Sequence, residues 1–261
     1  MPFANNNGVK IHYEVEGHGP PLLMQHGFSS SLDTWYEIGF VRALSQNYRL
    51  IMVDARGHGK SDKPHDSKAY ESSIVVRDLT SVLDHLKIQQ TNYYGYSYGA
   101  RIGMHLARLE MPRLNSLALG GTNPSNINGE ASKQRIKVYE EMEKNPNLNM
   151  ADIIAILEAA NGQMTPEQKI KVMQNDARAL IACGKAFYAW PDTLAVLPKL
   201  SIPCLIMDGE ADRYYPAVKE SVVLIPNAVL VTFPGLNHSQ VSRGSDVVLP
   251  HIKKFLASVN K

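Results

Sequence analysis

A serine that stands between two glycines is the first feature of this chain that suggests covalent chemistry. Ser97 lies in the segment Gly95-Tyr96-Ser97-Tyr98-Gly99, after the apolar run 91–94 and before the helix-like stretch 100–109. A serine on such a strand-to-helix turn holds its hydroxyl clear of the backbone, and side chains in place of the glycines would collide with neighbouring elements. The N-terminus of the following helix favours developing negative charge. We therefore predict that Ser97 is a nucleophile that attacks an ester-like carbonyl.

A serine hydroxyl needs a base that takes its proton, and the chain contains nine histidines. His238 follows the last apolar run, 228–233, in the loop 234–238. Because the loops at the carboxyl ends of parallel strands gather at one rim of a sheet, we expect this loop to lie beside Ser97. We predict that His238 is the base. His12 lies in the first strand, on the face opposite its apolar side chains, so we expect it to be exposed.

An acidic residue must orient the base, and three candidates follow the apolar run 203–207: Asp208, Glu210 and Asp212. Asp208 still belongs to the strand end, where it can hold the following turn. Asp212 stands farther out and can reach the far nitrogen of an imidazole, so we predict it as the third residue and keep Asp208 as its main rival. The acid would fix the tautomer of His238 and stabilise the imidazolium without taking the proton. The order serine, aspartate, histidine is the expected one.

The tetrahedral intermediate of this chemistry needs two N–H groups aimed at its oxygen. One is the backbone N–H of Tyr98, the residue after the nucleophile, and the other comes from a loop after an early strand. That loop is Gln25-His26-Gly27-Phe28, and we choose the backbone N–H of Phe28. His26 is included as a substrate-binding candidate, with the alternative that it is a buried, hydrogen-bonded histidine that fixes the loop.

A second motif, Asp54-Ala55-Arg56-Gly57-His58-Gly59-Lys60-Ser61, follows the apolar run 49–53. Its glycines and charges are typical of an ordered turn near a site. We predict a structural role for it, with Arg56 in an ion pair and Asp54 binding backbone N–H groups.

The elements that must position these residues alternate along the chain. An alternating strand at 9–15 is followed by short apolar runs that are typical of parallel strands buried on both faces. Between the runs, Val75, Leu79 and Val82 fall on one helical stripe, as do Val248, Ile252 and Leu256. Strands that alternate with such helices predict a parallel sheet covered on both faces, with the first strand antiparallel at its edge.

One region breaks this alternation, because residues 123–197 contain helix signals and no convincing strand. We predict a core made of residues 1–122 and 198–261, with 123–197 as a helical cap inserted over one end of the sheet; an ordinary packed helical subdomain is the alternative. Helix starts are expected after Asn149 and at Thr165-Pro166. The substrate-binding candidates of the cap are aromatic, with core packing as the alternative for each: Tyr139, Phe187, Tyr188 and Trp190.

Composition narrows the class of protein. The 261 residues fit one α/β domain with an insertion, and a 44% hydrophobic share allows a full core. The net charge of +2 comes with no basic stripe, so we expect neither nucleic acid nor a membrane as partner. No stretch has the length of a membrane helix, the start lacks a signal-peptide pattern, and the two cysteines fit a reducing compartment. These features favour a cytoplasmic protein.

Taken together, the motifs resemble the α/β-hydrolase superfamily along nearly the whole chain, most closely its small esterase and lactonase branch with a helical cap. The motifs occur in the expected order: His26-Gly27-Phe28, 54–61, 95–99, 209–212 and Asn237-His238. The resemblance implies an α/β-hydrolase fold with a mostly parallel sheet of about eight strands, no metal and no organic cofactor. Dehalogenases and epoxide hydrolases of this fold carry an aspartate where this chain has Ser97, so an acyl-serine intermediate is implied.

The expected substrate is a small or medium uncharged carboxylic ester or lactone. One alternative is the hydrolysis of a carbon–carbon bond beside a ketone, for which Arg178 and Lys185 could supply charge in the cap. Acyl transfer to an acceptor other than water is another. A ligand sensor on the same fold is the alternative outside enzymes. The residues leave the natural substrate and the oligomeric state open.

Overall fold

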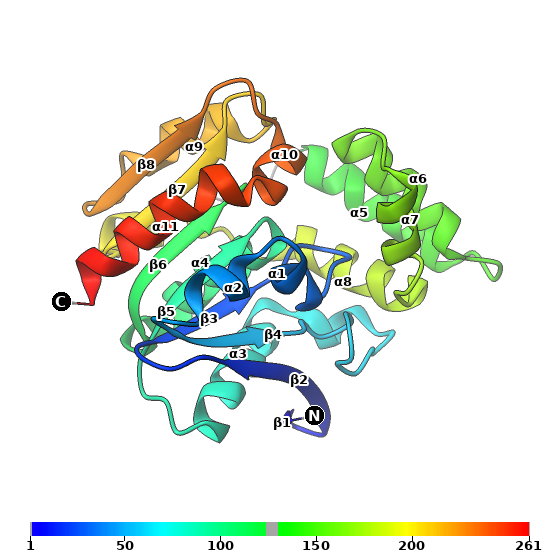
Figure 1. The fold of residues 1–261 in the computed structure, drawn as a ribbon. Helices are drawn as coiled ribbons and strands as arrows, with labels where there is room; N and C mark the ends of the chain where they lie inside the picture. Colours follow the sequence, from blue (N-terminus) through cyan, green and yellow to red (C-terminus); the bar gives the residue numbers. More distant parts are fainter. Residues whose placement is uncertain (1, 124–129, 261) are drawn as a thin grey trace.

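The computed structural model describes residues 2–123 and 130–260 (Figure 1). Its centre is one eight-stranded sheet in the order β1-β2-β4-β3-β5-β6-β7-β8. The strands are β1 (Phe3–Asn6), β2 (Val9–Glu16), β3 (Pro21–Gln25), β4 (Arg49–Val53), β5 (Thr91–Tyr96), β6 (Leu114–Gly120), β7 (Cys204–Gly209) and β8 (Ala228–Phe233). Strands β3 to β8 pair in parallel. The predicted fold class is confirmed.

The antiparallel end of the sheet differs from the prediction in one respect. Strand β2 pairs antiparallel with β4, but β1 adds a further antiparallel strand outside it. The expected first strand, 9–15, is therefore not the edge. A two-residue turn, in which Asn7 and Gly8 both have positive φ, joins the two strands into a hairpin. Phe3 of this extra strand packs against His12 of β2.

Apolar helices cover both faces of the sheet. On one face, α3 (Ser72–His85), α4 (Tyr98–Glu110) and α9 (Tyr215–Val222) contribute to one core cluster. On the other, α1 (Asp33–Glu37), α2 (Phe40–Leu44) and α11 (Ser245–Val259) contribute to a second. The stripes predicted from the sequence supply buried positions in α3 and α11. The sheet domain also contains three short helices: η1 (Ser67–Tyr70), η2 (Met111–Arg113) and α10 (His238–Arg243).

The described residues between β6 and β7 form helices only: α5 (Glu130–Glu143), α6 (Met150–Asn161), α7 (Pro166–Val172), α8 (Ala177–Ala189) and η3 (Leu194–Lys199). Residues 124–129 of the predicted insertion lie outside the described part. Capping boxes at Asn149 and Thr165 start α6 and α7. The side chain of Asn149 accepts a hydrogen bond from the N–H of Ala151, and that of Thr165 accepts one from the N–H of Gln168. In Figure 1, α5, α6 and α7 stand to one side of the sheet, and α8 lies between them and the core.

Helix α8 connects two hydrophobic clusters. Ala182, Cys183 and Ala186 belong to the main core, whereas Leu180 and Ile181 pack with residues of α5 and α6. The helical segment is therefore anchored to the sheet domain along one face of α8. Cys183 and Cys204 are both buried and unbridged. Within 2–123 and 130–260, none of the helices combines the length and the apolar character needed to span a membrane.

Candidate active site

Ser97 occupies a strained turn between β5 and α4. Its backbone angles are φ 55° and ψ −110°, a region that residues other than glycine rarely adopt. Strand β5 is buried along its whole length, and the helix begins at the next residue, Tyr98. The strain is held in place by the packing of both elements, which is typical of functional turns.

The two glycines of the turn are required by close backbone approaches. A Cβ atom on Gly99 would lie 2.1 Å from the carbonyl oxygen of Gln25, and one on Gly95 would lie 2.5 Å from the backbone of Gly99. Real Cβ atoms do not approach backbone this closely, so larger residues would push α4 away from β3 and β5. The glycines therefore let the start of α4 rest against the end of β3.

Three polar side chains predicted from separate segments meet at this turn. The Oγ of Ser97 lies 3.0 Å from Nε2 of His238, and Nδ1 of His238 lies 2.6 Å from Oδ2 of Asp212. When Nδ1–H donates to the carboxylate, Nε2 is free to accept the serine proton. The geometry is that of a nucleophile, a base and an orienting acid.

The loops that carry the base and the acid are fastened to each other. The N–H of Ala211 donates to the carbonyl of Leu236, and Gly209 approaches that carbonyl so closely that a Cβ would lie 2.1 Å from it. Asn237 caps α10 in a capping box, which places His238 in the first turn of the helix. The Tyr96 hydroxyl donates to the carbonyl of His238 over 2.6 Å. The position of the imidazole is thus set by contacts on both sides.

Of the two candidate acids, Asp212 is the one that binds His238. Burial works against the charge of Asp212, but the hydrogen bonds from His238 and from the N–H of Tyr214 bring its pKa below the ordinary value. Asp208 lies behind it, fully buried, and accepts a hydrogen bond from the N–H of Gly209. Burial and the neighbouring charge of Asp212 raise the pKa of Asp208 to about 8. The two carboxyls, rivals in the sequence, therefore differ in charge: Asp212 is ionised at neutral pH, whereas Asp208 holds a proton.

The proposed oxyanion donors border the same space as Ser97. Both Phe28 and Tyr98 line the pocket above the serine, and their rings meet edge to face at 5.9 Å. A Cβ on Gly27 would lie 3.7 Å from Cβ of Ser97, so the loop after β3 rests against the nucleophile. The loop and the first residue of α4 are therefore neighbours, as the prediction of a two-donor site requires.

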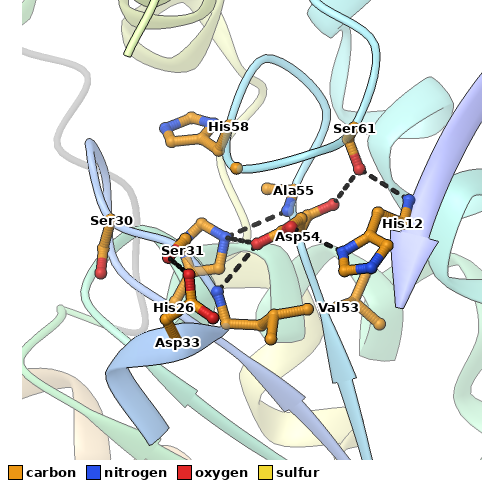
Figure 2. A network of polar contacts seen from close by, with 12 residues as sticks. His12, His26, Ser30, Ser31, Asp33, Val53, Asp54, Ala55, His58 and Ser61 are labelled. Atoms are coloured by element: carbon orange, nitrogen blue, oxygen red, sulfur yellow. Dashed lines mark hydrogen bonds and ion pairs between the residues drawn. The ribbon is translucent and has the colours of Figure 1, made fainter. Parts of the chain in front are cut away.

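The substrate-binding prediction for His26 does not fit its position, because its side chain is buried and is not among the described residues that line the pocket. Its Nδ1–H donates to the carbonyl of Gly27, and its Nε2 accepts from the N–H of Ala55 (Figure 2). Burial lowers the pKa of His26, which keeps the ring neutral. His26 joins the loop after β3 to the loop after β4, as in the alternative of a buried, hydrogen-bonded histidine.

The expectation that His12 is exposed is wrong. Its side chain is fully buried and its Nδ1 lies 2.8 Å from Oδ2 of Asp54 (Figure 2). The strand period correctly put His12 on the face opposite Ile11 and Tyr13, but β1 and the turn after β4 cover that face, and Phe3 packs against the ring. Periodicity identifies the face of a strand and not what covers it.

Asp54 organises the second motif as predicted. Besides His12, it accepts hydrogen bonds from the N–H groups of Leu32 and Lys60 at 2.8 and 2.9 Å. Arg56 forms a two-pronged ion pair with buried Asp78, with bonds of 2.9 and 2.6 Å. These contacts fix the loops behind Phe28. They do not reach the pocket, which supports a structural role for the motif.

The aromatic candidates of the helical segment divide into two groups. Tyr139, Phe187 and Tyr188 line the pocket. Trp190 is not among its lining residues in the described chain; it packs beside Tyr98 and Phe187 and donates its indole N–H to the carbonyl of Tyr70. Trp190 therefore supports the wall of the pocket and does not form it.

Three arginines that the sequence analysis did not single out also line the pocket: Arg101, Arg135 and Arg213. One signal was available for Arg101, which lies four residues after Ser97 and thus on the same face of α4. Arg213 directly follows Asp212. Arg135 lies in α5, and no motif in the neighbouring sequence indicates that it lines the pocket. By contrast, Arg178 donates to the carbonyl of Pro146 and Lys185 pairs with Glu143, away from the pocket lining.

The chain is similar in sequence and in fold to several known proteins. A family model described as alpha/beta hydrolase fold matches residues 20–149. The chain is 27% identical to a non-heme haloperoxidase of Rhodococcus erythropolis, over 99% of this chain and 100% of that protein. It is 23% identical to a bifunctional esterase/perhydrolase of Acinetobacter calcoaceticus, over 98% of this chain and 99% of that protein. The solved enol-lactonase from Burkholderia xenovorans LB400 superimposes with a TM-score of 0.83 at 23% identity, over 98% of this chain and all of that one.

Proposed function

Because the chain belongs to the α/β-hydrolase superfamily, we propose that it is a serine hydrolase that cleaves a small or medium carboxylic ester or lactone through an acyl intermediate on Ser97. The observation that carries the proposal is the unbroken line of contacts from Ser97 Oγ through His238 to Asp212, with distances of 3.0 and 2.6 Å. A hydroxyl at a strained turn with a base in reach is suited to nucleophilic attack.

In the first half of the reaction, Nε2 of His238 takes the proton of Ser97 while Oγ attacks the carbonyl carbon. The oxygen of that carbonyl becomes an oxyanion, which the backbone N–H groups of Phe28 and Tyr98 stabilise. The protonated imidazole then gives its proton to the leaving alkoxide. Asp212 stays ionised and holds the imidazolium by its Nδ1–H.

In the second half, water takes the place of the alcohol. His238 removes a proton from the water, the hydroxide attacks the acyl carbon, and Ser97 leaves as the tetrahedral intermediate collapses. The proton returns to Ser97 Oγ through the imidazole. The acid product and the free enzyme result, so no oxidant, reductant or external group is consumed.

Two relatives support ester chemistry at this site. The protein of Acinetobacter calcoaceticus carries the name esterase, and the structurally similar protein of Burkholderia xenovorans is an enol-lactonase. Both reactions begin with attack on an acyl carbon bound to oxygen. Transfer of the acyl group to an acceptor other than water would use the same first half.

The test is the hydrolysis of 4-nitrophenyl esters of graded acyl length by the wild type and by Ser97→Ala. We expect turnover that the variant loses by several orders of magnitude while its thermal unfolding stays unchanged. Near wild-type turnover in Ser97→Ala would remove Ser97 as nucleophile. Turnover of a ketone substrate in place of any ester would favour carbon–carbon bond hydrolysis, and ligand binding without turnover would favour a sensor.

A further inference from the structure

The loop that carries the proposed oxyanion donor Phe28 contains a strained residue of its own. Ser29, the next residue, has φ 60°, in the left-handed region that favours glycine. It stands at the third position of a turn that is closed by a hydrogen bond of 3.3 Å from the N–H of Ser30 to the carbonyl of Gly27. Glycine or asparagine ordinarily takes that position when φ is positive. A serine keeps such a conformation only where surrounding contacts hold it, so this turn depends on its neighbours.

One of these contacts comes from the helical segment between β6 and β7. Asn175, in the turn between α7 and α8, donates from Nδ2 to the carbonyl of Ser29 over 3.0 Å. The same amide group donates to the carbonyl of Val172, the last residue of α7, over 3.1 Å. This second bond fixes the amide to the helical segment. A side chain 146 positions away in the sequence therefore holds the carbonyl of the strained residue.

The ring of Phe28 is held by the same helical segment. It is partly buried, and it packs both against the main core cluster and against the cluster that α5 to α8 form. It also meets Tyr98 edge to face at 5.9 Å and the buried ring of His58 at 5.5 Å. The residue whose N–H is proposed to bind the oxyanion is thus clamped between the sheet domain and the helical segment.

Two further polar contacts join the region around Asn175 to the sheet domain. Lys171 of α7 pairs with Glu37 of α1, and His65 lies 3.0 Å from the carboxylate of Asp176, which caps α8. These side chains are substantially exposed, and pairs of this kind contribute little to stability. Breaking one of them loosens the same contact surface and leaves the bond from Asn175 in place, which makes such a variant a matched control.

We propose that Asn175 is a positioning residue of the oxyanion site: its amide holds the carbonyl of Ser29 and so keeps the N–H of Phe28 aimed at the oxyanion. This inference rests on the proposed serine hydrolase function and on the two oxyanion donors named there. The helical segment is then part of the catalytic geometry as well as a wall of the pocket. Because the oxyanion forms only after attack on the carbonyl, losing the amide should lower kcat more than it weakens substrate binding.

The first experiment measures kcat and KM on a 4-nitrophenyl ester that the wild type hydrolyses. Asn175→Asp has nearly the shape of the native side chain but places an acceptor against the carbonyl of Ser29, and Asn175→Ala removes the donor outright. We expect both to lower kcat about tenfold with little change in KM, as the loss of one hydrogen bond allows. Asn175→Gln keeps a donor and should retain more activity than either. Lys171→Gln, the control, should match the wild type.

The strain at Ser29 supplies a second test. Glycine adopts a positive φ without steric cost, so in Ser29→Gly the turn should depend less on the amide of Asn175. The loss of kcat that Asn175→Ala causes should therefore be smaller in the Ser29→Gly background than in the wild type. Equal losses in the two backgrounds would mean that Asn175 does not act through the conformation of Ser29, which would overturn the proposal.

Hydrogen exchange separates this inference from the function on which it rests. In Asn175→Ala, the backbone amides of residues 27–31 should exchange faster than in the wild type, and in Lys171→Gln they should not. Wild-type kcat in all three Asn175 variants, with hydrolysis that still requires Ser97, would overturn the positioning role and leave the hydrolase standing. An equal loss in Lys171→Gln would also overturn it, because docking of the whole segment would then be the cause. Faster exchange in a protein that hydrolyses no ester would contradict the hydrolase function and confirm that Asn175 holds the loop.

Discussion

Asp208 and Asp212 lie close enough at the end of β7 for their charges to interact, and their pKa values are shifted in opposite directions. Burial and the charge of Asp212 raise the pKa of Asp208, whereas the contacts with His238 keep Asp212 ionised. Two negative charges close together in the interior are unfavourable, so the pair of carboxyls keeps one proton. At neutral pH, Asp208 is then a neutral acid beside the residue that orients the base.

This division of labour predicts different results for two matched variants. Asp212→Asn should lower kcat on an active ester roughly ten-thousandfold, because the amide favours the wrong tautomer of His238. Asp208→Asn should keep most of the activity, because a neutral amide replaces a neutral acid there and the contact between Asp212 and His238 stays in place. Steady-state measurement of kcat for both variants tests these two expectations. The reverse order of losses would exchange the roles of the two acids.

The same pair predicts how stability depends on pH. The native pKa of Asp208 is about 8, above the ordinary value of 3.8. Between these values the native state holds a proton that the unfolded state has lost, so this group's contribution to stability is full below pH 4 and declines as the pH rises toward 8, by at most about 1.4 kcal/mol per pH unit. Urea unfolding of the wild type and Asp208→Asn at pH 5 and 8 measures it. The difference between the two proteins should shift in favour of the variant at pH 8; a constant difference would contradict the assignment.

Asp54 predicts the opposite pH dependence. Burial alone would raise its pKa, but nearby His26 and hydrogen bonds from Lys60, Leu32 and His12 bring it below the ordinary value. The stabilising contribution of Asp54 is therefore present above pH 4 and is lost as the pH falls through its native pKa. Asp54→Asn should lower the free energy of unfolding at neutral pH by about 3 kcal/mol, because an amide N–H would then face N–H donors.

The control for this variant is Asp62→Asn. Asp62 is exposed, and its side chain accepts a hydrogen bond from the backbone N–H of Lys10. Its substitution should change stability by less than about 1 kcal/mol. Chemical unfolding at pH 7 compares the two. Similar losses in both variants would mean that the buried network around Asp54 contributes little.

The contact between α4 and β3 predicts the effect of one added methyl group. Gly99→Ala would put a Cβ 2.1 Å from the carbonyl oxygen of Gln25, so the backbone must shift and the variant should lose about 3 kcal/mol of stability together with activity. Gly27→Ala is the control, because its Cβ would meet Ser97 and Tyr96 at an ordinary 3.7 Å. Thermal unfolding of both variants tests the contrast. An unchanged unfolding temperature in Gly99→Ala would show that the helix can move at little cost.

Much of the fold was predictable because it depends on local pattern. Short apolar runs between helical stripes predicted a mostly parallel sheet, and the family match and the observed sheet order confirm that fold class. The turn at Ser97 was predictable because a strand, two glycines and a helix stand in direct succession. The capping residues Asn149 and Thr165 were predicted for the same reason, since a cap acts within three residues of itself.

The parts that were missed all depend on contacts between distant segments. His12 was expected to be exposed, yet Asp54, 42 positions away, binds it in the interior. His26 was included among substrate-binding residues, yet it ties two loops together behind Phe28. The charge of the pocket escaped notice because Arg101, Arg135 and Arg213 belong to three elements.

By itself, the sequence determined the order of the elements, the strained turn that carries Ser97, and which loops stand at the carboxyl rim of the sheet. Each of these follows from residues that are neighbours in the chain. Only the tertiary structure decided that Asp212 and not Asp208 binds His238, and that three arginines face one pocket. The reason is that hydrogen bonds and electrostatic fields depend on distances of a few ångströms, and those distances are set when helices pack on the sheet.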